Sequence, residues 1–245
     1  MSGHLAIDDR DALLVVDVQS DFCPGGALAV PRGNEVVPLI NRLAECFAHV
    51  VLTQDWHPAG HQSFASSHPG HKPYETIDVA YGRQILWPDH CVQGTPGAEL
   101  CPELQISHAE LVLRKGFHRA IDSYSAFYEN DRRTQTGLAG YLRQRGLRRI
   151  FLAGLAFDFC VRYSAEDAHR EGLDVVVIED ACRSIDVDGS MRQHARPWRR
   201  WVSAAYRAPP SIERPQLVTS PRRRRDTVSG TSPLSWRIRE GDTCA

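Results

Sequence analysis

The sequence predicts an α/β domain of three layers, helix on sheet on helix, with a mostly parallel sheet. Short continuous runs of Val, Ile and Leu suit strands that are buried on both faces. Helical patterns separate these runs, and such alternation requires crossover connections between parallel strands. A chain of 245 residues is long enough for one such domain and a tail. The expected strands are Ala12–Val16, His49–Thr53, Glu110–Leu113, Arg149–Ala153 and Val175–Glu179.

Three segments between the expected strands have helical patterns. They are 35–47, with apolar residues on one side, 136–145 and 160–170. Gly146 and Gly172 stand where the second and third helices should end. Neither GxGxxG nor GxxxxGK[ST] occurs in the sequence, so the usual phosphate-binding loops of nucleotide enzymes are excluded.

The chain has two different compositions, although its net charge is only −1. Residues 1–190 carry an excess of acidic side chains and are expected to form the domain. Residues 191–245 contain Arg222-Arg223-Arg224-Arg225, no lysine and no apolar period. This composition predicts a disordered tail or a product of an altered reading frame, with neither helix nor strand. The alternative is a natural basic tail for an acidic partner. Specific nucleic-acid binding is not expected, because aromatic residues are not interleaved with the arginines.

The cysteines and the apolar runs indicate the cellular compartment in which the protein is expected. Seven cysteines without a CxxC pair do not suggest a disulfide framework, and a reducing compartment fits them. No run approaches the roughly 20 apolar residues of a membrane span. The first residues lack a basic start followed by an apolar stretch. We therefore expect a cytoplasmic protein without a membrane partner.

Three reactive side chains follow separate expected strands. Asp17 follows one expected strand and Lys115 follows another. Cys160 is the first residue of an expected helix shortly after a third strand. The carboxyl ends of parallel strands meet at one edge of a sheet, so these side chains should converge. A thiol at a helix N-terminus is favoured as thiolate, which is the nucleophilic form. A buried cysteine, a strand-end aspartate and a surface lysine would be the ordinary alternative for each residue alone.

A second cluster has the residue types of a metal site. Asp55 and His57 directly follow an expected strand, His61 comes soon after, and His90 lies further along. Imidazole and carboxylate ligands suit Zn²⁺, Fe²⁺ or Mn²⁺, and a set with a free position suits a substrate-binding metal. The spacing alone is a weak signal, since loop histidines are often only polar surface residues.

With these motifs in order, residues 10–190 resemble the nicotinamidase/pyrazinamidase group of the isochorismatase-like cysteine hydrolases. The resemblance implies that family's fold and a cysteine amidohydrolase. The motifs that carry it are residues 16–26 (VDVQSDFCPGG), 54–58 (QDWHP), 87–92 (WPDHCV), 114–116 (RKG) and the Cys160 loop.

The resemblance also implies roles for the strand-end residues. Asp17 would accept the proton of Cys160, and Lys115 would hold the pair ionised. The backbone N–H groups of Ala156 and Cys160 would bind the oxyanion, and a cis peptide between Leu155 and Ala156 would aim one of them.

A metal and a pocket follow from the same resemblance. One divalent ion (zinc, iron or manganese) would be held by Asp55, His57 and His90, with His61 as a possible further ligand. This ion would anchor the pyridine nitrogen of the substrate. The pocket positions that match the family are Phe22, Trp87 and Tyr124. Gln19, near the end of the Asp17 strand, and Leu155 are further candidate substrate-binding residues.

The implied reaction converts nicotinamide to nicotinate and ammonia in NAD salvage, with pyrazinamide as a surrogate, in a monomer or small homo-oligomer. One alternative is a related hydrolase for a carbamoyl or ureido substrate or isochorismate. Those branches usually lack the Asp55, His57 and His90 set. Another alternative is an inactive remnant, because the last family strand was not found and its loss would leave an unpaired sheet edge.

Overall fold

The computed structural model describes residues 7–191 and 204–206. The chain divides into two units, Met1–Pro215 and Gln216–Ala245, and the second lies outside the described residues. The first unit is built on a six-stranded sheet of order β5-β2-β1-β6-β7-β8, with every neighbouring pair parallel. These strands are β1 (Asp11–Val16), β2 (His49–Asp55), β5 (Leu111–Lys115), β6 (Arg149–Leu155), β7 (Asp174–Arg183) and β8 (Ala204–Tyr206).

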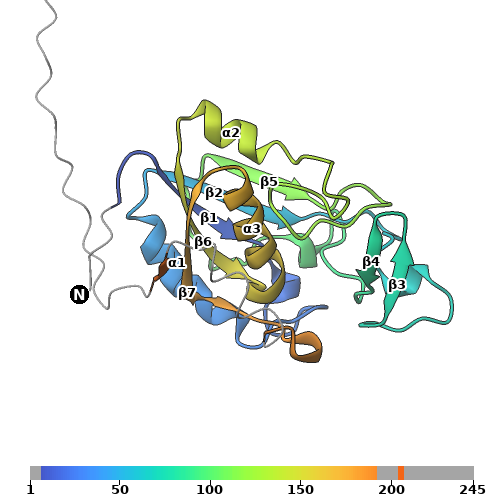
Figure 1. The fold of residues 1–245 in the computed structure, drawn as a ribbon. Coiled ribbons are helices and arrows are strands. Elements are labelled where there is room, and N and C mark those ends of the chain that lie inside the picture. Colours follow the sequence, from blue (N-terminus) through green and yellow to red (C-terminus); the bar gives the residue numbers. More distant parts are fainter. Residues whose placement is uncertain (1–6, 192–203, 207–245) are drawn as a thin grey trace, which may run out of the picture. The chain divides into compact units, whose positions relative to one another are not determined.

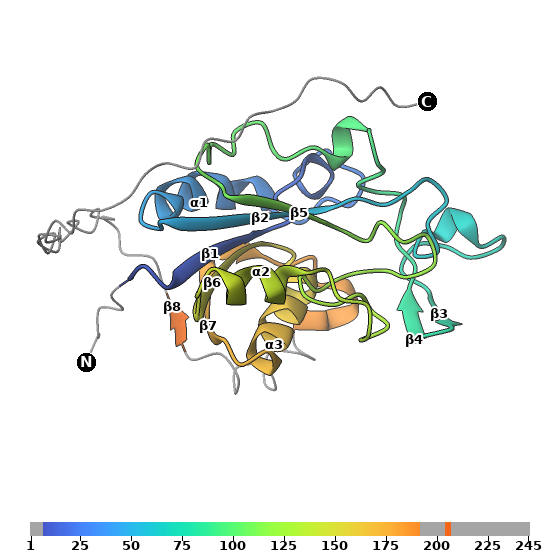
Figure 2. The same cartoon turned by 90° about the horizontal axis from the view of Figure 1, so that it is seen from above.

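Helices cover both faces of this sheet, which confirms the predicted three layers. Helix α1 (Val37–Ala44) lies on one face, and α2 (Leu138–Gln144) and α3 (Arg162–Arg170) lie on the other (Figures 1 and 2). All six residues of β1 are buried, as expected for a central strand covered twice. Within the described residues, no helix combines the length and the apolar character needed to cross a bilayer.

The expected helices are shorter in the structure. The segment predicted at 35–47 begins with a 3₁₀ turn, Gly33–Val36, and becomes α-helical at Val37. Pro38 stands in the first turn of α1, where its missing N–H costs no helical hydrogen bond. Val37, Ile40 and Leu43 then face the core.

Two elements were not predicted. An antiparallel hairpin of β3 (Thr76–Val79) and β4 (Gly82–Ile85) stands apart from the main sheet (Figure 1). Its strands are short and largely exposed, so they have no apolar run to reveal them. The second element is β8, which pairs with Val176–Ile178 of β7. The expectation that the segment after residue 190 contains no strand, and leaves this edge unpaired, is therefore wrong for these residues. Residues 192–203 and 207–245 lie outside the described residues.

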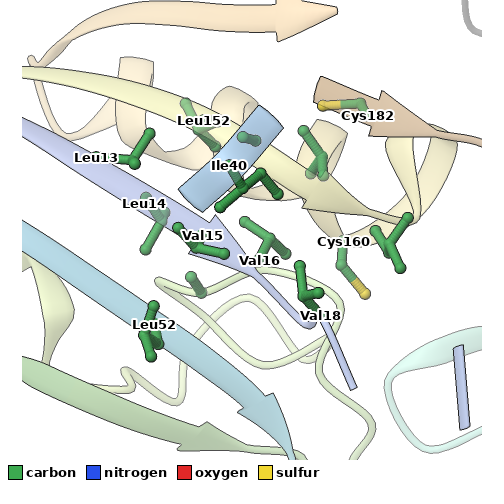
Figure 3. Close-up of a cluster of buried hydrophobic side chains, with 14 of the residues drawn as sticks. Leu13, Leu14, Val15, Val16, Val18, Ile40, Leu52, Leu152, Cys160 and Cys182 are labelled. Atoms are coloured by element: carbon green, nitrogen blue, oxygen red, sulfur yellow. The ribbon is translucent and has the colours of Figure 1, made fainter. Parts of the chain in front are cut away.

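The strands are packed closely where they approach the site. Val16 of β1 is paired with Gly154 of β6, which has φ +124°. A Cβ at Gly154 would lie 2.1 Å from the carbonyl oxygen of Val16, so only glycine permits this approach. Figure 3 shows Cys160 among the apolar side chains of this core.

Candidate active site

Lys115 is the centre of the site and is fully buried at the end of β5. Its Nζ lies 2.8 Å from Asp17 Oδ2 and 2.5 Å from Asp55 Oδ1. It also donates hydrogen bonds to the carbonyl oxygen of Ser123 (2.8 Å) and to Cys160 Sγ (3.5 Å). Register explains the contact with Asp55, because Asp55 of β2 is paired with Lys115 of β5 in the sheet. The three reactive side chains predicted from separate strands therefore meet at one ammonium group.

Asp17 follows β1 in a left-handed conformation, with φ 48°. Thr53 of β2 fixes its carboxylate: Thr53 Oγ1 donates to Asp17 Oδ1 at 2.5 Å and accepts the Asp17 N–H at 3.1 Å. Sequence analysis missed Thr53, since a threonine inside a buried strand looks like an ordinary strand residue. Only the pairing of β1 with β2 shows that it faces Asp17.

Cys160 lies in a π-helical turn, Phe157–Val161, that leads into α3. The predicted regular helix thus begins later, and the thiol sits in the wider turn before it. Asp17, Asp55 and Cys160 each offer an atom within 4.8 Å of the others. The peptide bond between Leu155 and Ala156 is cis, as the family resemblance implied.

Burial and charge set the protonation of these groups. Burial opposes the charge of Lys115, but the carboxylates of Asp17 and Asp55 outweigh it and raise its pKa well above the usual value. Burial raises the pKa of Asp17, although Lys115 opposes the shift. Burial also raises the pKa of the Cys160 thiol well above its usual value, with Lys115 again opposing. The resting cysteine therefore holds its proton, beside a carboxylate that is more basic than usual.

The second cluster consists of Asp55, His57 and His90, all buried. His57 Nδ1 lies 2.8 Å from the carbonyl oxygen of Gly116, and His90 Nδ1 lies 2.8 Å from that of Pro88. These contacts place the ring protons on Nδ1 and leave both Nε2 lone pairs free. The two Nε2 atoms lie 3.8 and 3.9 Å from Asp55 Oδ2.

This donor set fits a divalent metal ion. Among the residues that the structure describes, the buried His57 Nε2 has no hydrogen-bond partner, which is costly unless another group binds it. Burial lowers the pKa of His57 and of His90 to about 4, so both rings are neutral ligands at neutral pH. Gly116 is part of the fit, since a Cβ there would lie 2.4 Å from His57 Cε1.

Two neighbours of this cluster extend it. His61, a possible ligand from the sequence, forms a second candidate set with His57 and Asp122, whose ligand atoms lie within 4.8 Å of one another. In the structure its Nδ1 accepts from the Ser63 N–H at 3.2 Å, and its Nε2 faces the carbonyl oxygen of His118 at 3.0 Å. Asp122 was missed, although its buried Oδ1 lies 3.9 Å from His57 Nε2. Its loop carries no strand pattern, so no signal placed it at the sheet edge.

A pocket lined by residues of both clusters joins them. Three predicted aromatic residues line it, and the Tyr124 hydroxyl accepts a hydrogen bond from Trp87 Nε1 at 3.1 Å. Apolar walls with few polar groups are usual for a small-molecule site. The complete lining is Phe22, Leu28, Val30, Asp55, Trp87, His90, Asp122, Tyr124, Ala156, Phe159, Cys160 and Ile185.

Two predicted pocket residues are not part of this lining. The Gln19 side chain is buried, and its Nε2 donates to the carbonyl oxygens of Asp55 and Ala98, both at 2.8 Å. Its Oε1 accepts the Asp55 N–H at 2.8 Å. Gln19 therefore braces the end of β2 behind the pocket. Leu155 is fully buried in the core at the end of β6.

Known proteins are similar to this chain in sequence. The isochorismatase domain model matches residues 11–196. A nicotinamidase from Acinetobacter baylyi is 55% identical over 193 residues, which are 79% of this chain and 89% of the relative.

Solved structures agree in fold. A nicotinamidase and pyrazinamidase from Acinetobacter baumanii is 52% identical, with a TM-score of 0.80 over 82% of this chain and 97% of that one. A pyrazinamidase from Pyrococcus horikoshii in complex with zinc is 33% identical, with a TM-score of 0.64 over 80% of this chain and 99% of that one. The α/β fold and the extent of these matches lead to one assignment: the chain belongs to the isochorismatase family.

Proposed function

We propose that the chain hydrolyses nicotinamide to nicotinate and ammonia, as a metal-dependent cysteine amidohydrolase that also accepts pyrazinamide. The carrying observation is the contact of one buried ammonium, Lys115, with both Asp17 and Cys160, and Cys160 lines a pocket with aromatic walls. The identity to nicotinamidases supports the choice of substrate. The product would enter NAD salvage.

The first steps use the strand-end residues. Asp17 accepts the proton of Cys160, and Lys115 stabilises the thiolate and the neighbouring charge. The thiolate attacks the carboxamide carbon, and the backbone N–H groups of Ala156 and Cys160 bind the developing oxyanion. Asp17 then returns the proton to the departing ammonia. Water, activated by the same carboxylate, cleaves the thioester and releases the acid.

Asp55, His57 and His90 would hold the metal ion, and zinc, iron and manganese all match this ligand set. When bound, the ion supplies a positive charge and an open coordination position. Asp122 adds a buried carboxylate whose Oδ1 lies 3.9 Å from the same Nε2 of His57. Phe22, the indole of Trp87 and Tyr124 confine a flat ring between apolar surfaces, which orients its carboxamide toward Cys160.

Ammonia release tests the proposal directly. Purified full-length protein supplied with zinc, iron or manganese should release ammonia from nicotinamide. A chelator should lower the rate by at least about 100-fold, and metal add-back should restore it. A carbamoyl amide such as N-carbamoylsarcosine serves as the comparison substrate. Metal-loaded, folded protein that hydrolyses only the carbamoyl amide would overturn the substrate assignment, and chelator-resistant turnover would contradict the metal.

The contact of Thr53 with Asp17 leads to a second prediction. Thr53→Val keeps the shape of the side chain but removes both hydrogen bonds to Asp17. We expect kcat to fall by about 10-fold to 100-fold, because the carboxylate loses its orientation, and the free energy of unfolding to fall by about 1–3 kcal/mol.

Thr136→Val is the matched control. Thr136 Oγ1 donates to the carbonyl oxygen of Ala126 at 2.6 Å, away from the pocket lining. This variant should lose stability without loss of kcat in urea unfolding and steady-state assays. Equal loss of kcat in both variants would mean that Thr53 acts only through stability.

A further inference from the structure

We propose that Cys23 and Cys101 form a reversible intramolecular disulfide that fastens the wall of the pocket. This site lies outside the proposed catalytic and metal clusters. The two Sγ atoms are 2.6 Å apart, although 78 positions separate the residues in sequence. Two unbonded sulfur atoms do not normally pack so closely, and a disulfide bond measures about 2.05 Å. Only a small movement is therefore needed to form it.

The backbone around the pair holds it in place. Gln19 and Leu100 form an isolated antiparallel bridge. The N–H of Ser20 donates to the carbonyl oxygen of Glu99, and the N–H of Cys101 donates to that of Val18, both at 2.9 Å. The segments that carry the two cysteines are thus already paired before any covalent bond forms, and the thiols lie just beyond this pairing.

The two thiols differ in a way that suits thiol–disulfide exchange. Cys23 is partly exposed, and its hydrogen bond with the Cys101 thiol lowers the pKa of Cys23 below its usual value. The same contact raises the pKa of Cys101, which is buried. Cys23 is therefore the attacking thiol and Cys101 the resolving one.

A surface groove gives a reagent access to this pair. Both cysteines line it, together with Ser20, Asn34, Val37 and Asn41. Cys160, by contrast, is buried at the base of the pocket, and burial raises its pKa. An oxidant that enters the groove reaches Cys23 before Cys160.

The chemistry needs a low-molecular-weight disulfide, RSSR, as the oxidant. Deprotonated Cys23 attacks one sulfur of RSSR and forms a mixed disulfide, and RS⁻ leaves and takes up the released proton. Cys101 then attacks Cys23 Sγ, and the second RS⁻ leaves with the Cys101 proton. The two cysteines lose two electrons and two protons, and RSSR is reduced to two RSH.

The Cys23–Cys101 bond would restrain a loop that lines the pocket. Phe22 directly precedes Cys23 and lines the pocket, as do Leu28 and Val30 further along the same loop. The bond would tie this loop to residues 98–101, whose Ala98 carbonyl accepts from Gln19. Because it closes a loop of nearly 80 residues, we expect the melting temperature to rise by about 10 °C on oxidation.

The test equilibrates the folded full-length chain with oxidised glutathione and then blocks free thiols. Trypsin should yield residues 11–32 linked to residues 84–114, and fragmentation should place the bond at Cys101, not at Cys91 of the same peptide. Dithiothreitol should reverse both the bond and the rise in melting temperature. Mass and melting readouts do not depend on nicotinamide hydrolysis, so this test stands or fails apart from the proposed function.

Variants make the assignment specific. Cys23→Ser and Cys101→Ser should each abolish the oxidation-dependent rise in melting temperature. Cys46→Ser, which removes a thiol elsewhere, should retain it. The proposal is overturned if both thiols stay free after equilibration, if only mixed disulfides form, or if a different pair of cysteines is linked.

Discussion

Replacing Cys160 with alanine will lower the rate of ammonia release from nicotinamide by at least about 10⁴-fold, because it removes the sulfur on which the proposed acyl intermediate forms. Cys160 is linked to the metal cluster through Lys115, whose Nζ contacts both Cys160 Sγ and Asp55 Oδ1. Metal content, measured by elemental analysis, should therefore stay at the level of the parent protein. Melting temperature should change by only a few degrees, since alanine fits the buried turn.

Cys182→Ala is the matched control, since Cys182 is also a buried cysteine of the core but lies in β7, outside the pocket lining. This variant should keep the parent rate. Turnover near the parent rate in Cys160→Ala, with metal retained, would remove Cys160 as nucleophile. Loss of metal together with activity would show that the change acts through the metal cluster.

Replacing His57 with alanine will have the second large effect. It removes the Nε2 that lies 3.8 Å from Asp55 Oδ2 and 3.9 Å from Asp122 Oδ1 and that has no hydrogen-bond partner among the described residues. We expect metal affinity to fall by at least about 100-fold, since even residues that only orient a ligand contribute 10-fold to 100-fold. Turnover should fall with it. Competition with a chromogenic chelator measures the affinity independently of activity.

His68→Ala provides the control for a lost imidazole. His68 is half-buried, and its Nε2 contacts the carbonyl oxygen of Gln62 at 2.8 Å, outside the cluster. The His68→Ala variant should keep the metal affinity of the parent protein. Full metal affinity in folded His57→Ala would exclude the site formed by Asp55, His57 and His90.

The strand ends were predictable because they follow from topology. Once the buried runs are taken as parallel strands, residues that directly follow them must meet at one edge, whatever their separation in sequence. Asp17, Asp55 and Lys115 are such residues, and the structure brings them within reach of each other.

Residues whose position depends on register or on loop path were not predictable. Thr53 faces Asp17 only because β2 is paired with β1 in one register. Asp122 comes from an irregular loop that the sheet does not position. Gln19 was placed in the pocket because it is near Asp17 in sequence, but its amide bonds the backbone of Asp55. The β8 strand was missed because three residues cannot establish a period.

The four contacts of Lys115 have a consequence for the proposed reaction. An ammonium has three N–H bonds, yet its neighbours are Asp17, Asp55, the Ser123 carbonyl and Cys160. While the Cys160 thiol keeps its proton, only Asp17, Asp55 and the Ser123 carbonyl need a hydrogen bond from Lys115. After the proton moves to Asp17, that carboxyl needs none and the thiolate takes its place. Three neighbouring groups therefore need an N–H from Lys115 before the proton transfer and three need one after it. Rotation of the ammonium group about its C–N bond lets its three N–H groups satisfy both states.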